Sequence, residues 1–384
     1  MKIDPYNNQE GYLEWKKKVS SSGKIGGLNK ANSEILLRFL DDMEIGINVG
    51  MGAKKGSRSF VRLKSLRDKL AFLFKKTEEL FDLQKIYEVS EVQLHSVFSY
   101  MENGKIAKVN GEKYKAVGDY VKIFKTFWHW YQKINKKNGL EIKDITSDLN
   151  AKSEKPDWVY LTEEQIRSLC DKAKYEYKVL IMFLFDTGIR APTELMNIKV
   201  SDFFNDFKEL NIREDISKTF GRRIKLMISS ELIKEYIKVK NLKATDFVFD
   251  ISPPCTNRYL RRLAEKLFGD KPSEAGQKYS ELTMYDFRHC SCCYWLPRYK
   301  SESALKYRFG WKSSDKIHYY SELLGMRDTI SEDDMLVDVT KTEIEQRLAQ
   351  SEKKSEILQE RLENMEKYLE KYKYVLTKIQ MEVQ

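Results

Sequence analysis

The chain has 384 residues, of which 41% are hydrophobic and 33% are charged, and its net charge is +10. This length is too great for one compact core and suits two domains with an extension. The positive charge favours a polyanionic partner, and no apolar run reaches the roughly 18 residues of a transmembrane helix. The chain also begins without the apolar segment of a signal peptide. We therefore expect a cytoplasmic protein that binds nucleic acid and has no membrane partner; a membrane-surface role has only the charge in its favour.

Five cysteines stand at positions 170, 255, 290, 292 and 293. Their odd number and irregular spacing do not form a disulfide framework, which suits a reducing compartment. The stretch HCSCC, from His289 to Cys293, resembles part of a metal site, but the second ligand pair of a closed zinc site is missing. We expect no metal and no cofactor.

The first part of the chain is predicted to be helical. Residues 1–30 are polar and are expected to form a flexible N-terminal segment, whereas apolar residues recur at three- and four-residue spacing over 31–148. Basic residues cluster near one helix start, where phosphate contacts are favoured over ordinary solvated helix faces. The residues predicted to make these contacts are Lys54, Lys55, Arg58, Arg62 and Lys64.

Residues 149–158 are polar, include a proline and are predicted to link this domain to a second one over 159–335. The second domain begins with a helix, for which Thr162 and Gln165 form a capping-box pattern. An apolar helix is expected to end at Gly188, and strands are expected over 207–215, 222–228 and 246–250.

Basic residues of the second domain are further candidates for DNA contact. Arg222 and Arg223 follow the turn between the first two expected strands. A helix expected from about residue 255, with Thr256 as its cap, carries Arg258, Arg261 and Arg262 and has a pattern suited to the major groove. A solvated basic face is the alternative for this helix.

The last part of the chain, residues 340–384, has no proline and repeats apolar residues on alternating three- and four-residue steps over about five heptads. This pattern predicts a coiled-coil helix that associates with another copy of the chain. Packing against its own domain is the alternative.

Four stretches of the second domain carry residues with useful chemistry: DTGIR, SKTFGRR at a predicted hairpin tip, YDFRH and FGWKSSDKIHYY. Each of these stretches is unspecific when taken alone. In chain order they supply Arg190, Lys218, Tyr285, Arg288, Trp311 and the adjacent pair Tyr319 and Tyr320.

In this order the stretches resemble the tyrosine recombinase, or phage integrase, family, and its archaeal members in particular. The resemblance covers about 160–330 by motif and extends over 31–148 by domain layout. It implies a fold that is mainly α with a small antiparallel β-sheet. The parts would be a helical, SAM-like core-binding domain that binds DNA, an α+β catalytic domain and, in this chain, the coiled-coil helix.

The resemblance also implies a role for each matching residue. Arg190 and Arg288 would bind the scissile phosphate, Trp311 would donate its indole N–H to that phosphate, and Lys218 would protonate the leaving 5′ oxygen. Tyr320, nine residues after Trp311, occupies the nucleophile position, one residue beyond Tyr319. Two guanidinium groups can stabilise the charge on a phosphate under attack without a metal ion. A 3′-phosphotyrosine bond would conserve the energy of the broken phosphodiester, so that no ATP is needed.

Two positions depart from the family pattern. Tyr285 stands where the family has a histidine, and a phenol with a pKa of about 10 is a poor base at neutral pH. The role of base then stays open between Tyr285, Lys218, water, His289 and His318. The stretch RAPTEL also has one residue more than the family's first arginine motif, which leaves the match of Glu194 to the supporting acid open.

The resemblance implies a site-specific DNA recombinase, or integrase, that cleaves and rejoins double-stranded DNA at an attachment site and acts as a tetramer. One alternative is a relaxing enzyme similar to type IB topoisomerases. Another is a non-catalytic DNA-binding accessory protein with a decayed site, for which Tyr285 is the best support. The target sequence, the direction of the reaction, the mobile element and the host stay open.

Overall fold

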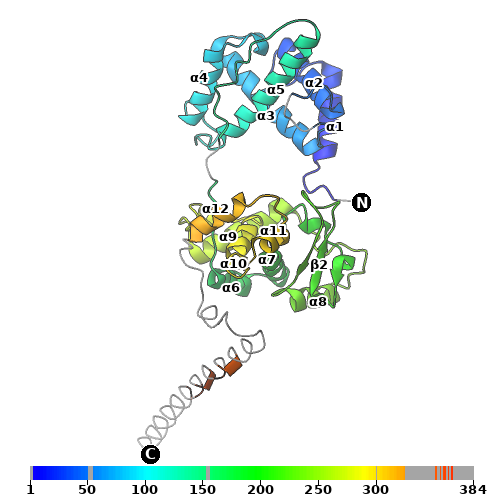
Figure 1. Cartoon of the computed structure of the whole chain (residues 1–384), viewed down its shortest axis with the longest axis vertical. Helices are drawn as coiled ribbons and strands as arrows, with labels where there is room; N and C mark the ends of the chain where they lie inside the picture. Colours follow the sequence, from blue (N-terminus) through cyan, green and yellow to red (C-terminus); the bar gives the residue numbers. More distant parts are fainter. Residues whose placement is uncertain are drawn as a thin grey trace, which may run out of the picture. The chain divides into compact units, whose positions relative to one another are not determined.

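The computed structural model describes residues 3–50, 55–152, 156–299 and 301–324, together with residues 351, 352, 355, 358, 359, 362 and 365 (Figure 1). Lys54 and most of the predicted coiled coil lie outside the described residues. The chain divides into two units: residues 1–294 with 301–313, and residues 295–300 with 314–384. Each unit is described by itself.

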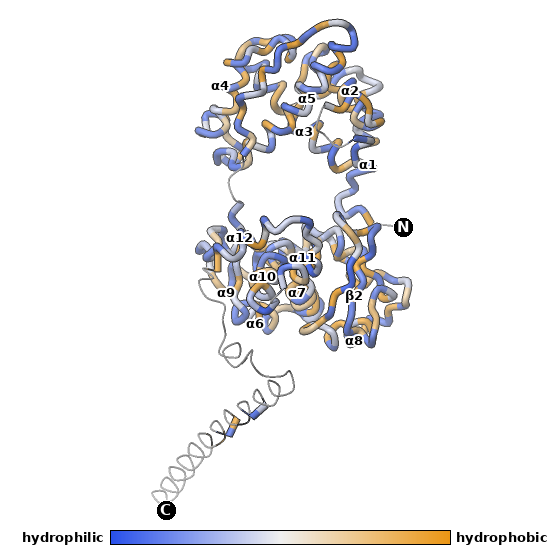
Figure 2. Tube along the Cα trace, in the orientation of Figure 1, coloured by the Kyte–Doolittle hydropathy of each residue, from blue (hydrophilic) through white to orange (hydrophobic). Residues whose placement is uncertain are grey.

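Helices alone build the first part of the larger unit. They are α1 (Asn8–Ser22), α2 (Lys30–Ile45), α3 (Phe60–Phe81), the short 3₁₀ helix η1 (Ile86–Glu88), α4 (Glu91–Glu102) and α5 (Val117–Lys137). Hydrophobic and hydrophilic residues alternate along these helices in Figure 2, as amphipathic helices require. Aromatic residues of α5 pack in the core: Phe127 contacts Phe39, Phe74 and Trp130 with ring centroids 5.0–5.7 Å apart.

The structure differs from the sequence prediction at the start of the chain. Residues 8–22, which were expected to be flexible, form α1 because Tyr12 and Val19 lie on one helix face and are buried in the core. The ring of Tyr12 lies 5.5 Å from that of Trp15 and 5.9 Å from that of Phe60. So few apolar residues in a polar stretch gave no clear periodic signal.

The second part of the larger unit combines helices with a small sheet. Its helices are α6 (Glu163–Lys172), α7 (Tyr175–Thr187), α8 (Ser230–Val239), α9 (Pro253–Phe268), α10 (Asp286–Trp295), which ends at the unit boundary, α11 (Glu302–Phe309), and the 3₁₀ helices η2 (Leu195–Asn197), η3 (Val200–Asp202) and η4 (Tyr279–Glu281). The strands β1 (Phe203–Phe204), β2 (Glu209–Ile212) and β3 (Arg222–Lys225) pair antiparallel in the order β1-β2-β3. The predicted class, mainly α with a small antiparallel sheet, is confirmed.

Two local predictions in this part are wrong. Residues 246–250 form no strand; Phe247 makes an isolated bridge with Lys199, while Val248 and Phe249 are buried. The cap of α9 is Ser252, and Thr256 lies buried inside the helix. Pro253 and Pro254 explain the early start, since proline fits the first turn of a helix, where no N–H partner is needed.

The predicted start of α6 is confirmed and gives a stability prediction. Gln165 donates its backbone N–H to the Thr162 hydroxyl at 3.3 Å, and Thr162 N–H donates to the Gln165 side chain at 3.0 Å. Thr162→Ala removes this cap and is expected to lower the free energy of unfolding by about 1 kcal/mol. A lower urea midpoint would show this, with Ser168→Ala on the exposed side of α6 as a near-neutral control. Equal midpoints for both variants would contradict the prediction.

Within the described residues, every helix is too short or too polar to cross a lipid bilayer.

Candidate active site

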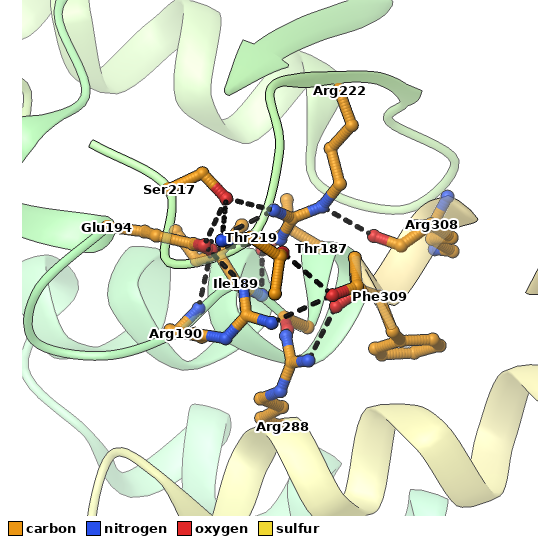
Figure 3. A network of polar contacts seen from close by, with 12 residues as sticks. Thr187, Ile189, Arg190, Glu194, Ser217, Thr219, Arg222, Arg288, Arg308 and Phe309 are labelled. Atoms are coloured by element: carbon orange, nitrogen blue, oxygen red, sulfur yellow. Dashed lines mark hydrogen bonds and ion pairs between the residues drawn. The ribbon is translucent and has the colours of Figure 1, made fainter. Parts of the chain in front are cut away.

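Three arginines from different elements lie close together, and two of them bind one glutamate (Figure 3). Arg190 follows α7, Arg222 begins β3 and Arg288 lies on α10. Arg222 and Arg288 are buried, and 15% of the Arg190 side chain is exposed. Glu194 is buried and forms ion pairs with Arg190 at 2.7 Å and Arg222 at 2.9 Å. The structure therefore brings together the two predicted phosphate-binding arginines and adds Arg222.

Glu194 is ionised at neutral pH. Burial alone would raise the pKa of its carboxyl group, but the hydrogen bonds and charge of Arg222, with the backbone N–H and charge of Arg190, lower that pKa to about 2. Ser217 adds a weaker hydrogen bond at 3.4 Å. The extra residue in RAPTEL does not prevent Glu194 from acting as the acid that supports Arg190.

The end of α11 provides three consecutive carbonyl groups for these arginines. The carbonyl of Arg308 accepts from Nε of Arg222 at 2.9 Å, and that of Phe309 accepts from Nη2 of Arg288 at 2.6 Å. The Gly310 carbonyl accepts from Nη2 of Arg190 at 2.9 Å. The last carbonyls of a helix lack partners within the helix and carry partial negative charge, so they suit guanidinium groups. We call these three groups the carbonyl row.

Gly188 connects α7 to the same site. Gly188 ends α7, as the sequence predicted, and has a φ of 58°. Its carbonyl accepts a hydrogen bond from Nη1 of Arg288. The Arg288 guanidinium also lies 5.5 Å from the ring centroid of Phe309. Both terminal nitrogens of Arg288 are thus held by backbone carbonyls, which fixes the direction of the group.

The hairpin loop between β2 and β3 carries Lys218, which is exposed. The residues on both sides of Lys218 are anchored at the arginine cluster. Thr219 donates its hydroxyl to the Gly310 carbonyl at 2.9 Å, and Ser217 donates to Glu194. The loop therefore presents the lysine next to residues that contact the site, while the ammonium faces solvent.

Trp311 and Tyr285 lie in the same unit. Trp311 directly follows the carbonyl row, is half-buried and stacks on Phe309 with centroids 5.0 Å apart. Tyr285 is 46% exposed, and its ring lies 5.2 Å from that of His289. His289 in turn stacks on Trp158 at 4.7 Å. The cysteines of HCSCC are all buried, and burial raises the pKa of the Cys290 thiol.

The two candidate nucleophiles lie on α12 (Asp315–Leu324), which belongs to the other unit. Tyr320 is 4% exposed and Tyr319 is half-buried, with their ring centroids 5.1 Å apart. His318 precedes them and is exposed.

Residues 159–327 match the model of the phage integrase family. We call this stretch the integrase domain, after the family model that it matches. Its predicted arginine, hairpin and tryptophan motifs all fall within the match, as does α12. The predicted closeness to archaeal members stays a prediction.

Solved structures show that the fold around the integrase domain is a known one. A lambda integrase (75–356) dimer bound to a COC′ core site has 15% identity and a TM-score of 0.56, covering 78% of this chain and 98% of the other. A lambda integrase tetramer bound to a Holliday junction has 13% identity and a TM-score of 0.52, covering 78% and 81%. The Tn1549 transposon integrase (82–397) with circular intermediate DNA has 14% identity and a TM-score of 0.51, covering 78% and 97%. No curated protein matches the chain.

The predicted DNA-contacting residues of the integrase domain fall into two groups. Arg258, Arg261 and Arg262 are exposed on α9, opposite the buried Thr256 and Leu260. Arg223 is exposed and pairs with Glu209 at 2.5 Å. Arg222 requires a correction: its side chain is fully buried and saturated by Glu194 and the Arg308 carbonyl, so it has no surface for DNA.

In the first, helical part of the chain, Lys55 is exposed, and Arg58, Arg62 and Lys64 are half-buried. Arg58 donates to the Gly56 carbonyl at 3.0 Å. Burial and the charge of Arg58 lower the pKa of Arg62, while Asp119 opposes that shift. The two neighbouring arginines repel each other electrostatically, so an anion bound beside them would be stabilised.

Sequence analysis missed the second buried ion pair near the site. Arg308 on α11 pairs with Asp186 on α7 at 3.0 Å, and both side chains are almost completely buried. Asp186 also accepts the backbone N–H groups of Met227, Ile228 and Ser229 ahead of α8. One available signal was the charged Asp186 inside an otherwise apolar helix, since a buried charge needs a partner.

Proposed function

We propose that this chain is a tyrosine site-specific recombinase that cleaves and rejoins DNA. The observation that supports this most is the charge of the arginine cluster. Glu194 pairs with Arg190 and Arg222, and Arg288 lies close enough for its charge to lower the pKa of Arg222. Among the described residues of this cluster, three positive charges are therefore accompanied by one negative charge. A buried excess of positive charge suits an anion of the size and charge of a phosphodiester.

The proposed reaction uses two phosphoryl transfers. The Tyr320 hydroxyl loses its proton and attacks phosphorus in line with the bond to the 5′ oxygen, which breaks as Lys218 donates a proton to that oxygen. Arg190 and Arg288 stabilise the charge that develops on the non-bridging oxygens, and the Trp311 indole N–H donates to one of them. A 5′ hydroxyl of a second DNA strand then attacks the 3′-phosphotyrosine, releasing the tyrosine and restoring a phosphodiester.

Several groups are candidates for the base that accepts the proton of the nucleophile. The Tyr285 phenol is exposed and next to His289, and an imidazole is in general a better base than a phenol. His318, Lys218 and water are further candidates. Because Tyr285 is exposed, its hydroxyl can donate a hydrogen bond to a phosphate even if another group accepts the proton of the nucleophile.

We further propose the partners and parts of the enzyme. The substrate is double-stranded DNA with a specific attachment site, in the cytoplasm. The contacts come from Lys54, Lys55, Arg58, Arg62 and Lys64 in a core-binding domain over 31–148, and from Arg223, Arg258, Arg261 and Arg262 in the catalytic domain over 159–335. The tetramer and junction named for the lambda integrase structure support a tetramer here.

We also propose that the coiled coil over 340–384 joins two copies of the chain. Leu358, Leu362 and Met365 of the predicted seam are helical and 60–64% exposed, as expected for a seam in a single chain. The residues proposed to be catalytic all precede this segment, so its role would be to raise the local concentration of protomers at the DNA.

A nicked suicide substrate tests the proposed function. DNA from the region flanking the gene is nicked near the cleavage position, so that the short fragment with the free 5′ hydroxyl diffuses away and the covalent complex accumulates. With EDTA present, we expect a protease-sensitive protein–DNA band on a denaturing gel. Strand exchange into a Holliday junction identifies a recombinase, whereas relaxation of supercoils without junctions identifies the topoisomerase alternative. DNA binding without a covalent band, across the whole flanking region, would contradict the proposal and favour the accessory protein.

A further inference from the structure

We infer that Arg222 is a positioning residue that acts on Arg190 through Glu194. This inference rests on the proposed function, because it concerns the arginine that would bind the scissile phosphate. Arg222 was predicted from the sequence to touch DNA, and its burial assigns it a different task.

Arg222 holds both oxygens of Glu194. Its Nη1 lies 3.2 Å from Oε1 and its Nη2 lies 2.9 Å from Oε2, while its Nε donates to the Arg308 carbonyl at 2.9 Å. All three guanidinium nitrogens thereby donate hydrogen bonds, two to Glu194 and one to the end of α11. A bidentate pair of this kind fixes the carboxylate's orientation as well as its position.

Glu194 passes this orientation to Arg190. Its Oε1 accepts from Nη1 of Arg190 at 2.7 Å, and its Oε2 accepts from the backbone N–H of Arg190 at 2.9 Å. The carboxylate therefore fixes both the backbone and the side chain of the same residue. Nη2 of Arg190 also donates to the Gly310 carbonyl at 2.9 Å.

Removing Arg222 would change the charge state of Glu194. The groups that face this carboxylate are Arg190 from the loop after α7, Arg222 from β3 and the Ser217 hydroxyl from the hairpin loop, with the Arg288 charge near Arg222. Without Arg222, burial acts against a single opposing cation, and the pKa of Glu194 rises. A protonated Glu194 accepts hydrogen bonds from Arg190 more weakly, so the arginine loses its alignment as pH falls.

Arg222→Met tests this because methionine keeps much of the side-chain length and removes the charge. We measure the rate of covalent adduct formation on the suicide substrate between about pH 5 and pH 8, divided at each pH by the wild-type rate. This ratio is expected to fall about tenfold from the basic to the acidic end. DNA affinity, measured by fluorescence anisotropy, is expected to stay within about threefold of wild type, since Arg222 is not at the surface.

Three further variants make the result specific. Arg222→Lys keeps a positive charge next to Glu194. Its rate divided by the wild-type rate is expected to be below one but independent of pH. Glu194→Gln leaves no carboxyl group to titrate at this position. The double variant with Arg222→Met is therefore expected to show no decrease in relative rate toward acidic pH. Its total loss of rate is expected to be smaller than the product of the two single losses. Arg308→Met removes the other fully buried arginine, which pairs with Asp186 and not with Glu194. It is expected to lower stability without an acidic fall in the ratio.

The outcomes separate this inference from the proposed function. If wild type forms no adduct, the proposed function fails first. Suppose that wild type forms the adduct. If the relative rate of Arg222→Met does not change with pH, or if that of Arg308→Met decreases equally toward acidic pH, the positioning role of Arg222 is wrong and the proposed function stands. If Arg222→Met does not fold, Arg222→Lys and Glu194→Gln decide: an acidic fall in Glu194→Gln would overturn the inference.

Discussion

Tyr320→Phe is expected to abolish the covalent protein–DNA complex, whereas Tyr319→Phe is expected to keep it. Phenylalanine preserves the ring and removes only the hydroxyl oxygen that would bond to phosphorus. Both tyrosines lie on α12 with ring centroids 5.1 Å apart, so the two variants disturb the same helix. A difference between them would therefore report the chemistry and not the packing.

The measurement uses the suicide substrate, with DNA binding measured in parallel to show that each variant is folded. Phosphoamino-acid analysis of the complex should give phosphotyrosine. Loss of the complex only in Tyr319→Phe would keep the enzyme class and move the nucleophile by one residue. A complex that persists in both variants would exclude α12 as the source of the nucleophile.

Gly188→Ala is expected to be among the most damaging single-methyl substitutions in the integrase domain. Gly188 has a φ of 58°, which costs an L-residue about 1–2 kcal/mol. A Cβ at this position would also lie 2.2 Å from Cε1 of Phe309 and 2.8 Å from Oγ of Ser291. Displacing Phe309 adds an overpacking cost of about 1–3 kcal/mol. It also moves two carbonyl partners of Arg288, one on Gly188 and one on Phe309.

Gly23→Ala provides the matched control. Gly23 ends α1 with a φ of 64°, but a Cβ there would meet nothing within 4 Å. Urea unfolding should show a loss of stability of about 1–2 kcal/mol for Gly23→Ala and about 2–5 kcal/mol for Gly188→Ala. Adduct formation should fall only in Gly188→Ala. Similar losses of stability in the two variants would mean that the Phe309 ring moves aside at little cost.

Local patterns in the sequence were enough to predict much of the fold. The capping box at Thr162, the end of α7 at Gly188 and the pairing of the strands before and after the hairpin follow from neighbouring residues and are present in the structure. The stretch 246–250 had the composition of a strand, but its residues are buried without a partner strand along their length. Composition alone does not distinguish these two ways of burying apolar side chains.

The site was harder to predict than the fold because its members are joined over long distances in the chain. Arg222 and Arg223 are adjacent and chemically identical, and both were assigned to DNA. Side chains alternate across a strand, so β3 buries the first and exposes the second. Which of the two faces the interior depends on Glu194, 28 residues away, and on α11, 86 residues away. A pattern read over a few residues does not contain that information.

The carbonyl row has a consequence for the order in which the arginine cluster is completed during synthesis of the chain. Arg190, Arg222 and Arg288 are made early, but the carbonyl groups that orient them belong to residues 308–310, which follow 120, 86 and 21 residues later. A growing chain that has not reached Gly310 already carries Glu194, but it lacks the three carbonyl groups that also hold these guanidinium groups. The arginine cluster of the proposed recombinase would therefore be completed only after the parts proposed to hold DNA, and a chain released too early is expected to bind DNA without cutting it.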